Sequence, residues 1–186
     1  MPGQIKIDDG AGNYTILTNA GSLGSDKTIT LPNTTGTVAL TSDSFGKVLQ
    51  VVQATTSTAV EVASTTYADS GLSASITPSS ASNKVLVIVT QNIDIAINDN
   101  GLKGYMKLLR DATDIVTDSI VQIIAGGLTS HQMQLNHSIV YLDSPSTTSS
   151  TTYKTQIKVN DANNSGRIRA QDESSPSQII LMEIGA

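Results

Sequence analysis

Apolar and polar residues alternate in short runs along most of the chain, and clusters of Gly, Asn, Asp, Ser and Pro separate the runs. The alternation is clearest in residues 131–143 and 151–160, where every second side chain shares one face of an extended chain. The runs recur at close spacing, with no long helical segment between them. The pattern therefore predicts an all-β protein, built as an antiparallel β-sandwich or jelly-roll.

The individual strands beyond residue 45 follow from the same pattern. Residues 85–89 are apolar on both faces, which is typical of a central strand, whereas residues 93–97 alternate and predict a half-buried one. Asn100 and Gly101 form a strong hairpin signal that would return the chain through residues 105–110. Residues 114–125 fit a helical stripe closed by glycine, but their β-branched side chains favour a strand. The expected strands are residues 47–53 and 59–64, which are candidate partners, and residues 72–76, 84–90, 93–97, 105–110, 114–125, 131–143, 151–160, 167–170 and 178–184.

Residues 1–45 have shorter strand-like runs, and more turn-forming residues between them, than the rest of the chain. Four strand-like pieces, at residues 4–7, 14–18, 28–31 and 37–40, are separated by turn-forming clusters. Such short strands bury little surface alone. We interpret residues 1–45 as an extended N-terminal β arm for anchoring and assembly, and residues 46–186 as the β-sandwich domain. The alternative is a pair of hairpins folded onto that domain. The apolar residues expected to anchor the arm are Ile5, Ile7, Tyr14, Ile16, Ile29, Leu31, Val38 and Leu40.

The composition indicates a hydrophobic core with little aromatic surface. The 186 residues include one Phe, five Tyr and no Trp, so aliphatic side chains supply nearly all the apolar surface. We expect burial to be completed between subunits, although a small sandwich that is stable alone remains the alternative. The net charge is −5 with no basic stripe, which argues against binding nucleic acid. There is no apolar run of about 18 residues and no signal-peptide pattern, so neither membrane insertion nor secretion is expected.

Candidate chemistry is sparse. The chain has no cysteine, no Gly-x-Ser-x-Gly elbow and no phosphate-binding loop, and its carboxylates show no pairing that suggests a cleft. Arg167 and Arg169 share one strand face, which favours a solvated face or an intersubunit ion pair over a site for an anionic glycan. The Asp and Asn residues at 94–100 are more typical of a hairpin tip than of a calcium loop. We therefore expect no enzymatic activity, no cofactor and no metal.

The two histidines lie six residues apart on one strand face. This spacing favours ordinary packing, with a histidine ring around an oligomer axis as the alternative. The row is a candidate axial or interface surface formed by His131, Met133, Leu135 and His137. The loop after this strand is rich in Ser and Thr and is a candidate exposed contact loop, with Ser144, Ser146, Thr147 and Thr148 as the contact residues.

Several segments resemble structural proteins of bacteriophage particles. Residues 27–43 (KTITLPNTTGTVALTSD) resemble a segment common in tail-fibre and other virion proteins, especially of marine phages. The remaining similar segments are GKVLQVV at 46–52, TY at 66–67, GLSASITP at 71–78, NKVLV at 83–87, KLLRD at 107–111, LDSP at 142–145, TTYK at 151–154 and LMEI at 181–184. They resemble the β-rich terminal domain of the same proteins and together span most of the chain.

The resemblance implies a homotrimer on the exterior of a virion, made in the host cytoplasm. Its partners would be further copies of itself and other virion proteins, namely the major capsid protein or tail components. The short arm favours a capsid decoration (cement) protein whose arm clasps the shell. The alternative is a short tail fibre that recognises a host surface glycan or protein.

Overall fold

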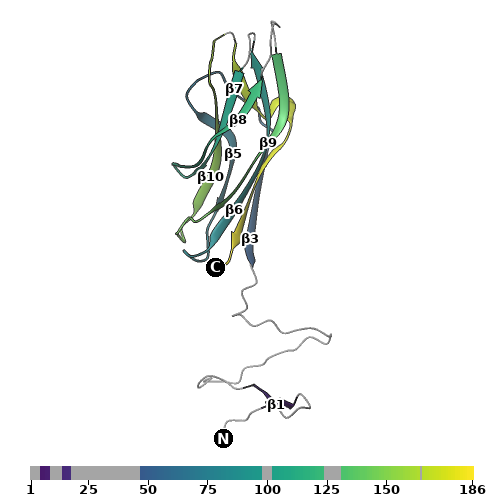
Figure 1. Ribbon diagram of the computed structural model, residues 1–186, viewed down its shortest axis with the longest axis vertical. Coiled ribbons are helices and arrows are strands. Elements are labelled where there is room, and N and C mark those ends of the chain that lie inside the picture. Colours follow the sequence, from purple (N-terminus) through teal and green to yellow (C-terminus); the bar gives the residue numbers. More distant parts are fainter. Residues whose placement is uncertain (1–4, 9–13, 18–46, 98–101, 124–130, 164) are drawn as a thin grey trace. The chain divides into compact units, whose positions relative to one another are not determined.

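The computed structural model describes residues 5–8, 14–17, 47–97, 102–123, 131–163 and 165–186, and it is an antiparallel all-β structure over these ranges (Figure 1). The chain divides into two compact units, Met1–Asp43 and Ser44–Ala186, so the division falls close to the boundary expected at residue 45. The strands of the second unit are β3 (Val48–Thr56), β4 (Val60–Val62), β5 (Ala68–Ile76), β6 (Lys84–Ile97), β7 (Leu102–Arg110), β8 (Thr113–Ile123), β9 (His131–Asp143), β10 (Thr151–Val159), β11 (Arg167–Ala170) and β12 (Ser177–Ile184).

The first unit contains a hairpin. Strand β1 (Ile5–Asp8) pairs antiparallel with β2 (Tyr14–Leu17), close to the two strands expected there. The expected pieces at residues 28–31 and 37–40 lie outside the described residues. Four of the candidate anchor residues lie on the hairpin, and Ile29, Leu31, Val38 and Leu40 lie outside the described ranges. The role of the first unit as an arm stays a prediction.

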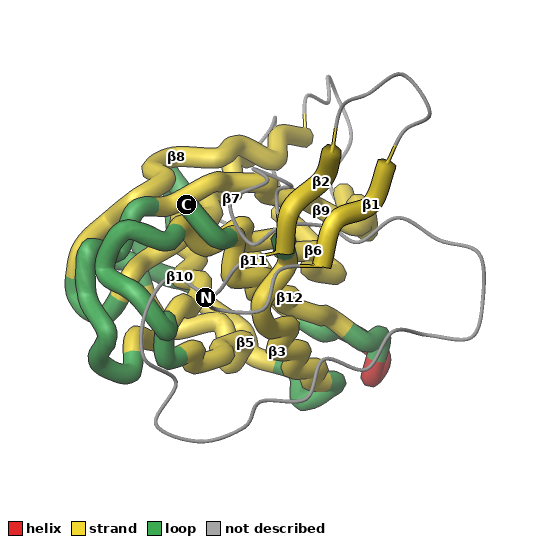
Figure 2. The backbone as a smooth tube through the Cα atoms, turned by 90° about the horizontal axis from the view of Figure 1, so that it is seen from below, coloured by secondary structure: helices red, strands yellow, loops and turns green. Residues whose placement is uncertain are grey.

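The second unit is a β-sandwich. One sheet has the strand order β3-β12-β6-β11-β4, with β9 on the other edge of β6, and the facing sheet has the order β5-β10-β7-β8. Figure 2 shows β7, β8 and β10 on one side and β3, β6 and β12 on the other. The expected sandwich is confirmed, and residues 113–123 form a strand, as their β-branched side chains predicted.

Strand β6 is the centre of the larger sheet. Its first half pairs with β12 through Lys84–Thr90, and its second half pairs with β11 through residues 93–96. Its opposite edge pairs with β9 along residues 85–97. The central position expected for residues 85–89 is confirmed. Residues 93–97 are instead buried on both faces, in the stretch where β6 lies between β9 and β11.

Two predicted strand pairings are wrong. Asn100 and Gly101 lie outside the described residues, but the pairing that they predict between β6 and β7 is absent, because these strands belong to different sheets and both edges of β6 are already paired. Similarly, β3 pairs with β12 and β4 pairs with β11, so residues 47–53 and 59–64 are not partners of each other. A turn signal shows where the chain reverses, but it does not show which strands then form hydrogen bonds.

The core lies between the two sheets and is almost entirely aliphatic. Its one fully buried large aromatic side chain among the described residues is Tyr153. The glycine at position 104 lets the sheets approach closely, because a Cβ atom there would lie 2.8 Å from Ile168 Cδ1 and 3.1 Å from Ile95 Cδ1. The residues of the core are Val62, Leu72, Ala74, Ile76, Val85, Val87, Val89, Ile93, Ile95, Ile97, Leu102, Met106, Leu108, Val121, Ile139, Tyr153, Ile157, Val159, Ile168, Ala170, Ile179 and Leu181.

Candidate interaction surfaces

Glu183 is a buried carboxylate with a full set of donors. It lies on the inward side of β12, and its Oε1 accepts hydrogen bonds from Asn83 Nδ2 at 2.6 Å and from the backbone N and Oγ of Ser79 at 2.7 Å. Its Oε2 accepts a bond of 2.7 Å from Gln50 Nε2. Burial alone would raise the pKa of Glu183, but the bonds from Asn83, Gln50 and Ser79 outweigh it and lower the pKa to about 2. The carboxylate therefore fastens the 77–83 loop to the sheet.

Asp143 is the second buried carboxylate whose bonds hold the fold together. Arg110 Nη1 donates to both of its oxygens at 2.9 Å, and Tyr153 Oη donates to Oδ2 at 2.7 Å. Burial and the bond to Asp143 raise the pKa of Tyr153, so the hydroxyl keeps its proton and remains a donor. These contacts join the end of β9 to the facing sheet.

An uncharged polar network fills the space between the sheets near Gln171. Thr155 Oγ1 donates to Gln91 Oε1 at 2.8 Å, and Ser70 Oγ lies within hydrogen-bond distance of Thr155 Oγ1. The amide orientation of Gln171 that satisfies its neighbours places its nitrogen 3.1 Å from Thr58 O and 3.0 Å from Ser70 O. Its oxygen then accepts from Gln91 Nε2 at 2.8 Å and from Ser177 Oγ at 3.0 Å. Sequence reasoning missed these residues, because nothing in the alternation pattern separates a buried polar side chain from an exposed one.

The candidate axial row lies on the side of β9 that faces the interior of the sandwich. Met133 and Leu135 pack against the core, and His137 Nε2 lies 2.7 Å from Ser119 Oγ of β8. Burial lowers the pKa of His137, which favours the neutral ring. His131, like the others, is half-buried. Met133, Leu135 and His137 therefore already contact other residues of the same subunit. The axial or interface role of the row stays a prediction.

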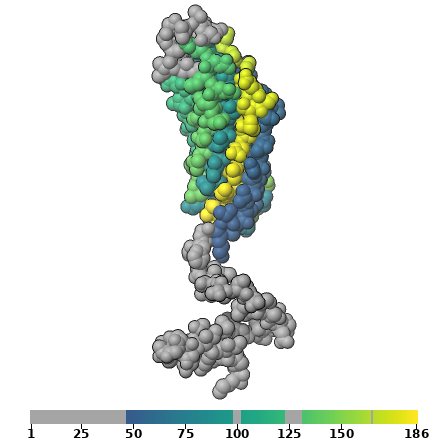
Figure 3. Space-filling view, turned by 90° about the vertical axis from the view of Figure 1, so that its right-hand side faces the viewer, coloured from purple at the N-terminus to yellow at the C-terminus, as the bar shows by residue number. Residues whose placement is uncertain are grey.

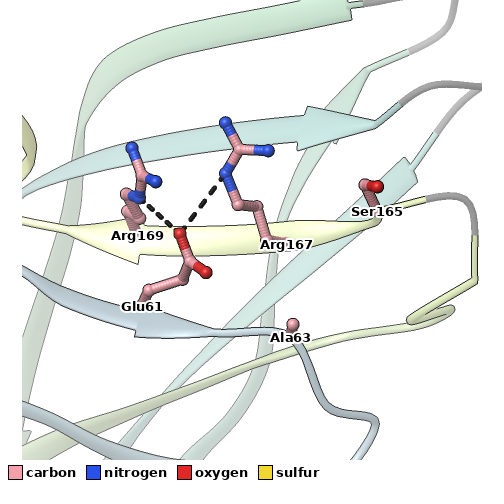
Figure 4. A pocket seen from close by; sticks show the side chains of 5 residues that line it. All are labelled: Glu61, Ala63, Ser165, Arg167 and Arg169. Atoms are coloured by element: carbon pink, nitrogen blue, oxygen red, sulfur yellow. Dashed lines mark hydrogen bonds and ion pairs between the residues drawn. The ribbon is translucent and has the colours of Figure 1, made fainter.

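The two arginines of β11 lie over a shallow cavity of about 340 Å³ at the surface of the larger sheet (Figure 4). Glu61 Oε2 lies 2.6 Å from Arg169 Nε and 3.4 Å from Arg167 Nε, so one carboxylate oxygen sits between both guanidinium groups. Arg169 Nη1 also lies 3.2 Å from Asp172 Oδ1. Ala63 and Ser165 complete the lining. Arg169 is thus paired with two carboxylates of its own chain, those of Glu61 and Asp172.

A buried carboxylate without hydrogen bonds lies beside these arginines. Register places Gln134, Asp94, Arg169 and Glu61 on one rung across four strands. Neither Asp94 oxygen has a hydrogen-bond partner among the described residues, and the same holds for Arg167 Nε. Burial raises the pKa of Asp94, and the positive charges of Arg167 and Arg169 oppose the shift. The sequence placed Asp94 near a hairpin tip, whereas the structure places it in the middle of a sheet.

The outer face of the larger sheet carries two apolar rungs. The first rung is Leu142, Leu86, Met182 and Val51, and the second is Val140, Ile88 and Ile180. We call these seven residues the apolar band. It crosses β9, β6, β12 and β3, whose surfaces run side by side in Figure 3.

The apolar band is exposed at both ends. Val140 is 66% exposed, Leu142 49% and Val51 56%, while the four central side chains are half-buried. Val48 and Leu49 extend the band at the start of β3. Of the six large apolar side chains that are exposed in the described residues, five lie here, and the sixth is Ile120 on β8. Sequence reasoning concentrated on the opposite face of β9 and missed the band, although Val140 and Leu142 break the run of polar outward residues.

The candidate contact loop lies at the surface. Ser144, Ser146 and Thr148 are exposed and Thr147 is half-buried. Arg110 Nη1 donates to Ser144 O at 3.2 Å, and Ser149 N donates to Thr147 Oγ1 at 3.0 Å, so the loop has internal order. Its role in contacts stays a prediction.

Two further observations concern the described ranges as a whole. The described residues include a short 3-10 helix, η1 (Asp172–Ser174), and no helix there has the length and apolar character needed to cross a bilayer. No group of three or more His, Asp or Glu side chains converges in them as a metal site requires.

The chain matches no protein-family model and no curated protein sequence. Among solved structures, it is similar to a chain in "Structure of infectious bursal disease virus Gx strain", with a TM-score of 0.34 and 14% sequence identity. The match covers 80% of this chain and 42% of that chain, so this chain spans less than half the length of its neighbour. At this level of likeness, function has to be argued from the surfaces described above.

Proposed function

We propose that this chain is a non-enzymatic structural protein on the exterior of a bacteriophage particle, where it assembles as a homotrimer. The observation that carries the proposal is the apolar band, because the largest contiguous apolar patch on a protein surface is often an interaction site. The resemblance of residues 27–43 and of the later segments to phage virion proteins indicates the setting.

The buried carboxylates support a structural role. Glu183 and Asp143 each accept several hydrogen bonds that connect separate parts of the fold, so neither is poised to exchange protons with a substrate. Arg169 is likewise engaged by Glu61 and Asp172. A depolymerase would need a carboxylate pair facing a cleft, and these residues do not supply one.

Within this setting we favour a capsid decoration protein. Residues 1–45 would clasp the shell, with the major capsid protein as partner, while the sandwich would project outward. The division of the chain into two units supports this arrangement, because an anchor and a displayed domain need separate structures.

A short tail fibre is the second candidate. The exposed Ser144 loop supports it, because a receptor-binding domain presents its contacts on surface loops held by a rigid scaffold. A host surface glycan or protein would then be the ligand.

Imaging of particles that carry the tagged full-length chain tests the proposal. Density on the capsid supports decoration, density on the tail supports the fibre, and absence of the chain from purified particles contradicts both. Native mass spectrometry of the isolated protein gives the second test. We expect a trimer, and a stable monomer at micromolar concentration contradicts the homotrimer.

A further inference from the structure

We infer that the apolar band of each copy packs against the bands of two further copies around the threefold axis. This inference rests on the proposed homotrimer and identifies the surface that forms it. The band consists of aliphatic side chains and one methionine, so a complementary partner must also present apolar groups.

Strand β9 shows that the band is a local feature. Its outward residues are polar from Gln132 to Ser138 and become apolar at Val140 and Leu142, within the same strand and on the same face. Outward positions on a solvated edge strand are usually polar or charged, which prevents association. The change at Val140 therefore marks the part of β9 that a partner covers.

The absence of charge from the band permits a second copy of this chain as that partner. Two copies that each carry a net charge of −5 repel one another unless they meet where neither carries charge. The band itself is uncharged. The next rung toward Asp94 is polar and uncharged, formed by Ser138, Thr90, Gln178 and Thr55. The rung on the other side places Lys84 beside Ile184 and Val48, so its one charge lies at the border of the band. The ionic rung with Asp94 and Arg169 lies about 20 Å further along β6, outside the centre of such a contact.

The size of the band fits the centre of an interface. Four adjacent strands make it about 14 Å wide, and two rungs make it about 7 Å high. Its exposed side chains with Val48 and Leu49 present on the order of 400 Å², compared with roughly 800 Å² on each partner in a standard interface. The surrounding polar rungs would supply the rim. A band about 14 Å wide is narrow enough for the bands of three copies to face one threefold axis.

Lysine substitutions in the full-length chain test the inference. Val140→Lys and Leu142→Lys each place three charges at the proposed axis, whereas Ile120→Lys makes the same change at an exposed isoleucine on the other sheet. We expect the Val140→Lys and Leu142→Lys variants to need at least 100-fold higher concentration for half-assembly in native mass spectrometry. Ile120→Lys should assemble as the wild type does. Circular dichroism and thermal melting establish that each variant is folded.

Cysteine labelling tests the same surface without introducing a charge, so it remains informative if the lysine variants fail to fold. The chain has no cysteine, so Val140→Cys and Ile120→Cys each introduce one unique thiol. We expect the thiol at position 140 to react with a maleimide at least 10-fold more slowly than the thiol at position 120 in the trimer. A short bis-maleimide should also join copies of Val140→Cys.

The outcomes separate this inference from the proposed function. A wild-type trimer that survives Val140→Lys, with both thiols equally reactive, overturns the band as the interface and leaves the homotrimer standing. A monomeric wild type overturns the homotrimer itself. A monomer in which the thiol at position 140 is protected shows that the chain covers its own band, which also overturns the inference.

Discussion

Tyr153 of β10 donates a hydrogen bond of 2.7 Å to Asp143 of β9, and this bond connects the two sheets of the sandwich through the core. Asp143 also binds Arg110, so the carboxylate keeps a charged partner if the tyrosine hydroxyl is removed.

Tyr153→Phe should therefore lower the free energy of unfolding by about 1.5–3 kcal/mol, which is the loss expected for one buried bond to a charged group. Chemical denaturation measures the change. Tyr141→Phe is the matched control, because it removes the same hydroxyl from a half-buried tyrosine on β9. Equal losses in the two variants would contradict a special role for the bond to Asp143.

Glu183→Gln should change how stability depends on pH. The folded protein holds the pKa of Glu183 at about 2, below the ordinary value of 4.5, so its contribution is complete above pH 4.5 and disappears as the pH falls toward 2. The wild type should lose stability over this window, and the Glu183→Gln variant should lose less. Thermal melting from pH 6 to pH 2.5 measures both curves. Glu173→Gln removes an exposed carboxylate as the charge control, and the idea fails if both variants follow the wild-type curve.

Gln171→Glu should be strongly destabilising at neutral pH, by about 3 kcal/mol or more, although the two side chains have nearly the same shape. A carboxylate there would face the carbonyl oxygens of Thr58 and Ser70, which the amide nitrogen now binds. Acidification should recover part of the loss, because protonation restores one donor. Urea unfolding at pH 7 and pH 5 measures this, and a variant as stable as the wild type would show that the network is not needed.

Gly104→Ala should lower the free energy of unfolding by about 1–3 kcal/mol through overpacking. The added methyl group would lie 2.8 Å from Ile168 Cδ1, and that atom belongs to a fully buried side chain. Ile168→Val removes the clashing methyl group, so the double variant should be more stable than the sum of the two single changes predicts. Additive losses in the double-mutant cycle would place the strain elsewhere.

The sequence predicts the strands far better than it predicts their partners. Residues 131–143, 151–160 and 178–184 alternate cleanly, and the corresponding strands β9, β10 and β12 lie close to those bounds. Pairing depends instead on contacts between distant parts of the chain. Strand β3 pairs with β12 at a separation of more than 100 residues, and no local signal specifies that choice.

The candidate surfaces show the same division. Alternation identifies the two faces of β9, but it does not show which face turns toward the core, and Met133 and Leu135 proved to be the inward ones. The apolar band is invisible in any single strand, because its rungs combine Leu86, Val140 and Met182 from three of them. Similarly, Asp94 looks like a turn residue until β11 and β9 are placed on either side of it.

The position of β12 between β3 and β6 has a consequence for biosynthesis. Every other strand of the sandwich is synthesised before β12, yet β3 has no hydrogen-bonded neighbour in its sheet until β12 is made. A nascent chain that stops before Ser177 would leave β3 unpaired and would lack the inward side chains Ile179 and Leu181. Synthesis of β12 is thus a precondition for the native fold, and products that lack it should be open to proteases rather than incorporated into an assembly.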